Sequence, residues 1–302
     1  MADLLTIGSV TFDSIRTPFG RGTRVLGGSG AYSAVAASLF VKTALVSIVG
    51  KDFQVKNQKI LEDLGIDTSG LAVHSSKKTM SWRAHYGFDI NLAKTDATKL
   101  NAFADFAPQL SDGFKRAPFL FLANSDPVCQ MSVLRQMARK PRLSVCDTMN
   151  YYIRRKPALV KEMVKSADIG LMNDAEARQL FKTSKLSAAA KEILALDSKY
   201  AIIKKGENGV VLFSNRTHFA LPGYPLENIK DPTGCGDVFG GAFLGYLART
   251  MDFDEGNIRR ALVTASAVAS FNAEDFSFKR LLSLSQTEIR NRVREFRKIV
   301  LF

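Results

Sequence analysis

Residues 231–247 carry the residue types best suited to chemistry. They read Asp-Pro-Thr-Gly-Cys-Gly-Asp-Val-Phe-Gly-Gly-Ala-Phe-Leu-Gly-Tyr-Leu. We expect the glycines to let the backbone amides of Gly234, Cys235 and Gly236 point toward one spot. An apolar helix pattern follows at once, with Asp237 in its first turn. A glycine-rich turn that leads into a helix presents unpaired N–H groups and the positive end of the helix dipole, so this segment favours an anion site.

The carboxylate of Asp237 is unexpected in a site that only binds an anion, because its negative charge would repel that anion. One interpretation is a helix cap after an ordinary glycine turn. The other is a general base that takes a proton from a substrate hydroxyl, while the amides stabilise charge on a phosphoryl group in transfer. The second interpretation accounts for the acid and the anion cradle together.

The longer string Asp-Pro-Thr-Gly-x-Gly-Asp-x-Phe-x-Gly resembles the C-terminal signature of the ribokinase-like, or PfkB-type, carbohydrate kinases. Members usually have Ser or Thr where Pro232 stands and Ala where Cys235 stands, and neither side chain carries the chemistry. Further segments in the family's order lie at 50–53 and 65–68, so the resemblance runs from about residue 4 to residue 300. It implies ATP and Mg²⁺ as cofactors, leaves a monovalent cation open, and places Thr233 in the nucleotide site.

At the acceptor end, Gly27 and Gly28 precede a helix pattern that begins Ser29-Gly30-Ala31-Tyr32. This is not a dinucleotide-binding fingerprint, because Ser stands at position 33 and no acidic residue follows at the right distance. In the resembled family the glycine pair passes under the sugar. With Asp13 it would form a floor for hydroxyl groups, since a carboxylate accepts hydrogen bonds from two adjacent hydroxyls. A simple turn is the alternative role of Asp13.

Two of these positions, Ser29 and Tyr32, bear on which acceptor the chain would bind. Ribose-specific members carry Lys and Asn where Ser29 and Tyr32 stand, so ribose is expected to be a poor substrate. Tyr32 either stacks on the apolar face of a nucleoside or cyclitol or packs into the core. Asn150 follows Asp147 at the end of a strand pattern, where open parallel sheets place their ligands, and is expected to contact the acceptor.

At the nucleotide end, Asn173 and Glu176 have the spacing of a helix capping box. The same arrangement resembles the family motif that holds Mg²⁺, usually through water, and both roles stay open. Lys204, Gly206 and Gly209 match the family turn that lines the nucleotide pocket, although a plain hairpin would explain them too. The resemblance adds Lys205 as an alternative contact and Asn272 near the adenine.

Short apolar runs alternate with helix patterns, which indicates an α/β fold: a doubly wound, mostly parallel sheet flanked by helices. Residues 1–302 are expected to form a single ribokinase-like domain. Residues 10–27 and about 72–95 break the alternation as paired strands, and the resemblance implies a small β lid there that serves as a homodimer interface. We expect strands at 4–9, 43–49, 118–122, 143–147, 168–171, 200–204 and 209–213. We expect helices at 30–40, 54–64, 128–138, 157–166, 174–182, 187–196, 237–249, 256–271 and 286–300.

The composition of the chain bears on its binding partners and its cellular location. The 302 residues are 46% hydrophobic and 24% charged, with a formal net charge of +13. Seven Lys and Arg against two Glu lie at 276–302, opposite an apolar helix stripe, so the charge does not predict specific nucleic-acid binding. Three scattered cysteines, no signal peptide and no apolar run near the ~20 residues of a membrane span favour a cytoplasmic protein.

Taken together, these patterns predict an ATP-dependent kinase that phosphorylates an alcohol group of a sugar or sugar-like molecule. A nucleoside kinase of the same architecture is the alternative. A non-catalytic relative is disfavoured because Asp237 and both neighbouring glycines are present. A Walker-type site is excluded by the absence of Gly-x-x-x-x-Gly-Lys-Ser/Thr.

Overall fold

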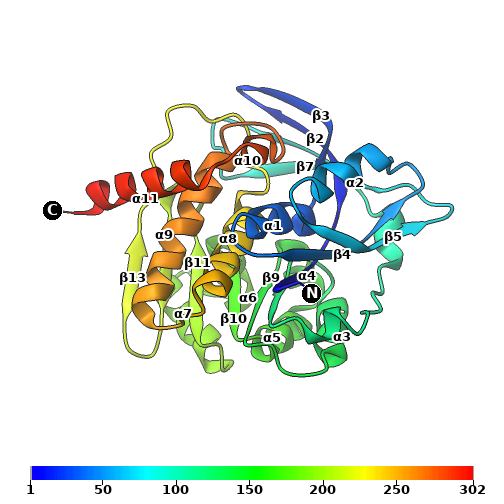
Figure 1. The fold of residues 1–302 in the computed structure, drawn as a ribbon. Coiled ribbons are helices and arrows are strands. Elements are labelled where there is room, and N and C mark those ends of the chain that lie inside the picture. Colours follow the sequence, from blue (N-terminus) through cyan, green and yellow to red (C-terminus); the bar gives the residue numbers. More distant parts are fainter. Residues whose placement is uncertain (1, 302) are drawn as a thin grey trace.

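The computed structural model describes residues 2–301 (Figure 1). A nine-stranded sheet forms its centre, with strand order β13-β12-β11-β10-β9-β8-β1-β4-β5. All neighbours from β11 to β5 are parallel, while β12 and β13 are antiparallel additions at one edge. The strands are β1 (Leu4–Ile7), β4 (Thr43–Gly50), β5 (Asp67–His74), β8 (Phe119–Leu122), β9 (Leu143–Asp147), β10 (Ile169–Asn173), β11 (Tyr200–Lys204), β12 (Val210–Phe213) and β13 (His218–Leu221).

Helices cover both faces of this sheet, because its central strands are apolar on both sides. One face packs against α1 (Ser29–Ser38), α2 (Val55–Glu62), α8 (Cys235–Thr250), α9 (Glu255–Asn272), α10 (Lys279–Leu282) and α11 (Gln286–Val300). The other packs against α3 (Pro127–Gln136), α4 (Asn150–Arg155), α5 (Pro157–Ser166), α6 (Asp174–Phe181) and α7 (Leu186–Ala195). The predicted doubly wound, mostly parallel architecture is therefore confirmed.

A second sheet projects from the first. Its four strands have the order β3-β2-β6-β7 and are β2 (Thr11–Thr17), β3 (Gly20–Gly27), β6 (Met80–Tyr86) and β7 (Ala93–Lys99). The two hairpins meet through a parallel pairing of β2 with β6. The predicted second segment is shifted, because residues 72–74 end β5 of the large sheet and the second hairpin continues to residue 99. Below, these four strands are called the small sheet.

Besides three short 3₁₀ helices, at Asn101–Asp105, Phe114–Arg116 and Gly206–Asn208, the sequence patterns missed two strands and two α-helices of the described chain. Strand β5 is half exposed and β13 has only one buried residue, so neither shows an apolar run. Helices α4 and α10 span six and four residues, too short for a helical period to emerge. In α11, Ile289 and Phe296 are buried as the apolar stripe predicts. Within residues 2–301, no helix has the length and apolar character to cross a bilayer.

Helices α1 and α8 lie in unusually close contact, and glycines in α8 allow it (Figure 1). A Cβ atom added to Gly241 would lie 2.1 Å from the backbone oxygen of Ser33. One added to Gly245 would lie 3.0 Å from the Cα atom of Ala37. Both obstacles are backbone atoms, so a side chain would push the helices apart.

We therefore expect Gly241→Ala to lower the free energy of unfolding by at least about 2 kcal/mol, the range for overpacking a tight core. Gly113→Ala is the matched control, because Gly113 has φ −64° and the nearest atom to an added Cβ, Ser111 Oγ, is 3.9 Å away. Stability of that variant should be unchanged or slightly raised. Urea unfolding of both variants measures the difference, and equal stabilities would contradict the close-packing argument.

Candidate active site

The predicted anion cradle lies where α8 begins, at the carboxyl edge of the parallel strands. Gly234 precedes the helix with φ +78°, in the left-handed region. A Cβ atom on Gly234 would lie 2.5 Å from the ring of Tyr32. Backbone conformation and close approach thus both require glycine here. The turn rests directly on the Tyr32 ring.

The cradle differs from the prediction in one respect. The amide of Cys235 donates a 3.2 Å hydrogen bond to the carbonyl of Pro232, so it is already used inside the turn. Among the described residues, no carbonyl accepts from the amides of Gly234 and Gly236. These two amides, and not that of Cys235, remain for an anion. The thiol of Cys235 faces inward and donates to the carbonyl of Ala269 at 3.4 Å.

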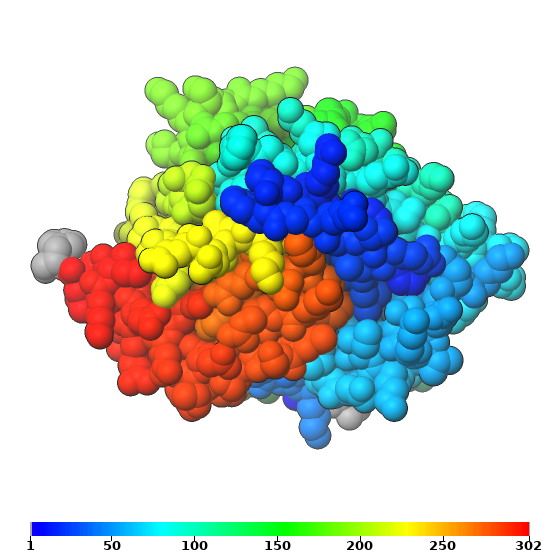
Figure 2. Space-filling model, turned by 90° about the horizontal axis from the view of Figure 1, so that it is seen from above, coloured from blue at the N-terminus to red at the C-terminus, as the bar shows by residue number. Residues whose placement is uncertain are grey.

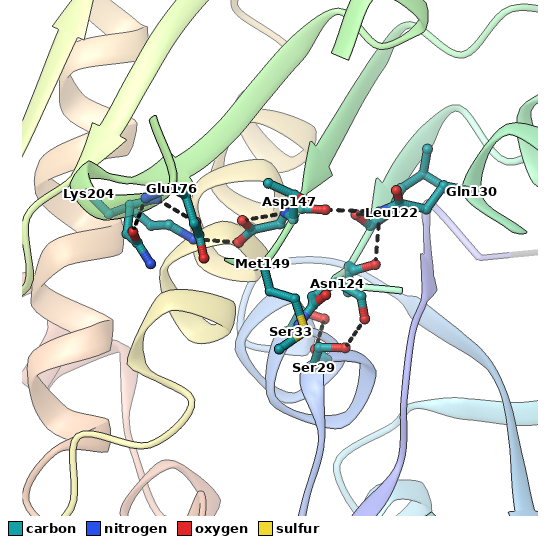
Figure 3. Close-up of polar contacts among 12 residues, drawn as sticks. Ser29, Ser33, Leu122, Asn124, Gln130, Asp147, Met149, Glu176 and Lys204 are labelled. Carbon is teal, nitrogen blue, oxygen red and sulfur yellow. Dashed lines mark hydrogen bonds and ion pairs between the residues drawn. The ribbon is translucent and has the colours of Figure 1, made fainter. Parts of the chain in front are cut away.

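A buried lysine lies beside this turn. Lys204, the last residue of β11, pairs with the carboxylate of Asp147, the last residue of β9 (Figure 3). The Lys204 ammonium lies 3.4 Å from the point where a Cβ of Gly236 would be. Burial alone would lower the pKa of Lys204, but Asp147 and Glu176 raise it above its usual value, so the side chain is charged. A fixed positive charge therefore borders the free amide of Gly236.

Asn173 and Glu176 form the capping box that their spacing predicts. The Asn173 side chain accepts from the Glu176 amide at 2.8 Å, and the Glu176 carboxylate accepts from the Asn173 amide at 2.7 Å. Glu176 is nonetheless only 6% exposed and lies near Asp147 and Lys204. Burial first, and then repulsion from Asp147, raise the pKa of Glu176. The predicted cap is confirmed, and it also holds a buried carboxylate near Asp147 and Lys204.

Asp237 projects from the first turn of α8 into this cluster. Burial, followed by repulsion from Asp147, raises its pKa to about 7, while Lys204 acts in the opposite direction. A carboxylate with a pKa near neutrality can accept a proton from a hydroxyl and release it again. Its position and its pKa fit a general base.

Asp13, the centre of the predicted acceptor floor, lies in β2. This carboxylate is 3% exposed and accepts from the hydroxyl of Thr11 at 2.7 Å. A Cβ on Gly27 would lie 2.1 Å from Asp13 Oδ2, so the glycine leaves room for the acid. Gly28 has φ +102° and lies against the carbonyl of Ser9. Burial, above all, raises the pKa of Asp13 to about 7, and Asp231 adds to the shift.

Two predicted acceptor contacts lie deeper than expected. Tyr32 is 2% exposed, with its ring under Gly234 and edge-on to Phe278 at 5.5 Å. Of the two roles left open for Tyr32, the structure shows core packing. The hydroxyl of Ser29 is also used internally: it lies 3.1 Å from Ser9 Oγ and donates to the carbonyl of Asn124 at 2.9 Å.

Asn272, expected near the adenine, is fully buried behind the cradle instead. Its side-chain amide donates to the carbonyl of Thr233 at 2.9 Å. It therefore positions the turn from within, because its place at the end of α9 faces the core. The Thr233 hydroxyl points the other way and lies 3.1 Å from the hydroxyl of Tyr86 in the small sheet.

The predicted nucleotide turn joins β11 to β12. Lys205, Gly206 and Gly209 form a tight loop in which the Lys205 amide donates to the Gly209 carbonyl at 2.7 Å, and both glycines have positive φ. Asn91, from the small sheet's β6–β7 loop, accepts from the amide of Glu207 at 3.0 Å. A loop far away in sequence thus lies against this turn.

The sequence analysis missed two residues of this region, Gln130 and Asn124. Gln130 in α3 donates to the carbonyls of Leu122 and Asp147 at 3.1 and 2.9 Å, which joins the ends of β8 and β9 (Figure 3). The side-chain carbonyls of Asn124 and Asn150 are buried and have no partner among residues 2–301. Asn124 lies two residues after the end of buried strand β8, much as Asn150 lies three residues after the end of β9, and that position was its only signal.

The small sheet leans over the same edge. Thr17 donates to the carbonyl of Lys230 at 2.7 Å, and the hydroxyl of Ser277 bonds to the carbonyl of Leu26. Gly22 packs against the ring of Phe276. In Figure 2 this sheet lies against the segments around residue 230 and residue 275. The small sheet and the region after α9 thereby pack together over the predicted acceptor floor.

The family model for pfkB family carbohydrate kinase matches residues 1–279. The chain belongs to this family. A cytidine kinase of Thermococcus kodakarensis is 29% identical over 264 residues, covering 84% of this chain and 92% of the relative. A nucleoside kinase of Methanothermobacter thermautotrophicus is 26% identical, covering 90% of each chain. An Escherichia coli protein provisionally assigned as ribokinase II, solved with ATP and Mg²⁺, superposes with a TM-score of 0.81 at 20% identity over 98% of this chain and 100% of that one.

As a pfkB family member, the chain is an ATP-dependent phosphotransferase whose acceptor is a sugar or nucleoside hydroxyl. The predicted activity class is therefore confirmed. The relatives include kinases that act on nucleosides and a kinase that acts on ribose, so family membership is compatible with both acceptor classes.

We expect Asp237→Asn to lower kcat by roughly 10²–10⁴-fold, because an amide cannot accept the proton of the hydroxyl. In the wild type, kcat/KM should decrease as the pH is lowered through about 7, because protonation of Asp237, whose pKa is about 7, removes the base. Initial rates across pH measure both effects. Glu255→Gln, an acid in the first turn of α9, is the matched control and should keep full activity. Asp237→Asn activity within about tenfold of wild type would reduce Asp237 to a helix cap.

Proposed function

We propose that the acceptor is a nucleoside, phosphorylated on a ribose hydroxyl, with Asp237 as the general base. The observation that carries the proposal concerns the side-chain carbonyls of Asn124 and Asn150, which follow β8 and β9 at the carboxyl edge of the sheet. Both are buried and have no partner among residues 2–301. Buried polar groups nearly always have hydrogen bonds, so such carbonyls indicate donors supplied from outside the chain. A nucleobase amino group is such a donor.

The surroundings of Asn124 suit a flat ring as well. Its side-chain amide is 3.1 Å from the sulfur of Met149, which is 37% exposed. A thioether is a soft apolar contact for an aromatic ring. The backbone carbonyl of Asn124 holds Ser29, so this surface adjoins the acceptor floor. A free sugar has hydroxyls for Asp13 but no apolar ring for Met149. The two nucleoside-acting relatives point the same way.

The chain's own groups then divide the reaction. Asp13 accepts hydrogen bonds from ribose hydroxyls and orients them. Asp237 takes the proton of the attacking hydroxyl as its oxygen bonds to the γ-phosphorus of ATP and the bond from that phosphorus to ADP breaks. The amides of Gly234 and Gly236, with Lys204, stabilise the negative charge of the phosphoryl group. The small sheet excludes water, which would otherwise compete with the acceptor.

For ATP, we propose that Lys205, Gly206 and Gly209 line the nucleotide pocket, next to Thr233. Asn173 and Glu176 would lie on the Mg²⁺ side. The three carboxyl groups of this region, on Asp147, Glu176 and Asp237, outnumber its one lysine, Lys204. This excess of acidic groups would favour a divalent cation. In residues 2–301 no three metal-binding side chains gather into a complete site, so phosphate and water would supply the remaining ligands. When bound, Mg²⁺ neutralises charge on the phosphates.

A monovalent cation has one suitable donor nearby. Asp231 is 1% exposed, and its Oδ1 accepts from the amide of Thr233 at 2.9 Å. Its Oδ2 is buried without a partner among the described residues. Burial raises the pKa of Asp231. We propose that a monovalent cation binds there and supports the cradle from behind.

Two further proposals concern the cellular location of the protein and its oligomeric state. A cytoplasmic location would supply ATP and suits the three free cysteines. A homodimer through the small sheet would cover its edge strands β3 and β7, of which β7 is almost wholly exposed.

We expect Glu176→Gln to raise the Mg²⁺ concentration needed for half-maximal rate by about tenfold or more, because it removes charge next to the phosphates. The acceptor KM should not change, and glutamine can still complete the capping box. Glu288→Gln is the matched control, since Glu288 has the same role in the capping box of α11. Identical Mg²⁺ titrations for the two variants would leave capping as the only role of Glu176.

Among candidate acceptors, we expect kcat/KM for cytidine or adenosine to exceed that for ribose by at least about tenfold, because only a nucleoside pairs with the open amide carbonyls. Asn124→Ala should lower kcat/KM for the better nucleoside and leave that for ribose almost unchanged. A coupled ADP-release assay provides all values. A ribose value tenfold above both nucleosides would overturn the proposed acceptor.

A further inference from the structure

A hollow in the surface lies at the edge of the large sheet opposite to the cradle. It has a volume of about 610 Å³. Its walls come from the residues just before β1, β8 and β9 and from the C-terminal ends of α1 and α8. Ligand pockets typically measure about 300–1,000 Å³, so the hollow could hold a molecule of nucleotide size. None of the residues assigned to phosphoryl transfer lines it.

The rim of this hollow is strongly basic. Lys42, Arg139, Arg142 and Arg249 line it, against a single carboxylate, that of Asp3. None of these four side chains forms an ion pair within residues 2–301, although the chain has many ion pairs elsewhere. Arg249 lies in the last turn of α8, where a cation balances the helix dipole. The other three lie in connecting segments, so the dipole does not explain them.

The interior of the hollow is apolar and partly aromatic. Phe40, Phe119 and Met251 contribute to its lining. The guanidinium of Arg249 lies 4.9 Å from the ring centroid of Phe40, in cation–π geometry. Its Nη1 also donates to Gln286 at 3.0 Å, which fixes the side chain from α11. A ligand that satisfies both parts of the site must combine an anionic group with a flat ring.

We infer that this hollow is a binding site for a nucleoside phosphate, separate from the active site. The phosphate would lie among Lys42, Arg139 and Arg142, which can each donate charge-assisted hydrogen bonds. The base would lie against Phe40 and Met251. Helices α1 and α8 begin at the acceptor floor and the anion cradle and end at this hollow. A nucleotide bound here therefore contacts the two helices that position the catalytic groups.

Calorimetric titration of the full chain with ADP at low salt tests the inference. The double variant Arg139→Ala/Arg142→Ala removes two exposed cations and no buried packing. It should bind one equivalent of ADP fewer than wild type, or bind that equivalent at least about tenfold more weakly. Arg290→Ala/Arg294→Ala on α11 changes the net charge equally, and its side chains bond only within that helix, to Thr287 and Asn291. This control should bind as wild type does.

Three outcomes would overturn the inference: equal ADP stoichiometry and affinity in wild type and the Arg139/Arg142 variant, an equal loss in both double variants, or a titration with inorganic phosphate in which the Arg139- and Arg142-dependent equivalent binds as tightly as it does with ADP. The last would show an anion site that does not recognise the base. The readout is the difference caused by Arg139 and Arg142, so it holds whether or not ADP also binds at the active site.

Discussion

Three carboxylates, those of Asp147, Glu176 and Asp237, share one poorly hydrated region with the ammonium of Lys204, and the organisation of the active site depends on this imbalance. Burial and mutual repulsion raise the pKa values of Glu176 and Asp237, so the chain keeps these groups close to protonation. Asp147 pairs with the ammonium of Lys204. The cost of the remaining negative charge is lowest when a cation arrives with the phosphates, so we expect metal binding to favour the ionised form of Asp237 that its predicted role as a base requires.

Side chains from three helices, α3, α9 and α1, support that arrangement. Gln130 fixes the ends of β8 and β9, and so the strand that carries Asp147. Asn272 holds the carbonyl of Thr233, and the Tyr32 ring lies under Gly234. Each support is itself buried and bonded or packed, which reduces the freedom of the groups it positions. The cradle is therefore rigid before any substrate binds.

Sequence patterns predicted the parts of this site that local spacing determines. Asp237 at the start of α8 and the Asn173–Glu176 capping box follow from residues within a single turn. The inward positions of Tyr32 and Asn272 depend on which distant element packs against them, and no short pattern records that. The internal use of the Cys235 amide depends on the exact turn formed after Pro232. The strands of the large sheet were predictable because they are continuous apolar runs, whereas half-exposed β5 was not.

The hydrogen bonds between the small sheet and the rest of the chain bear on how the enzyme turns over. Tyr86 meets Thr233 of the cradle, and Asn91 meets Glu207 of the nucleotide turn, so one sheet touches both halves of the site at once. We expect an acceptor beneath that sheet to enter or leave only when these contacts break. Their opening would then be a step separate from phosphoryl transfer that can limit kcat. Because the Asn91 contact lies at the turn predicted to bind the nucleotide, we expect departure of the nucleotide product to loosen the sheet first, which favours an ordered release.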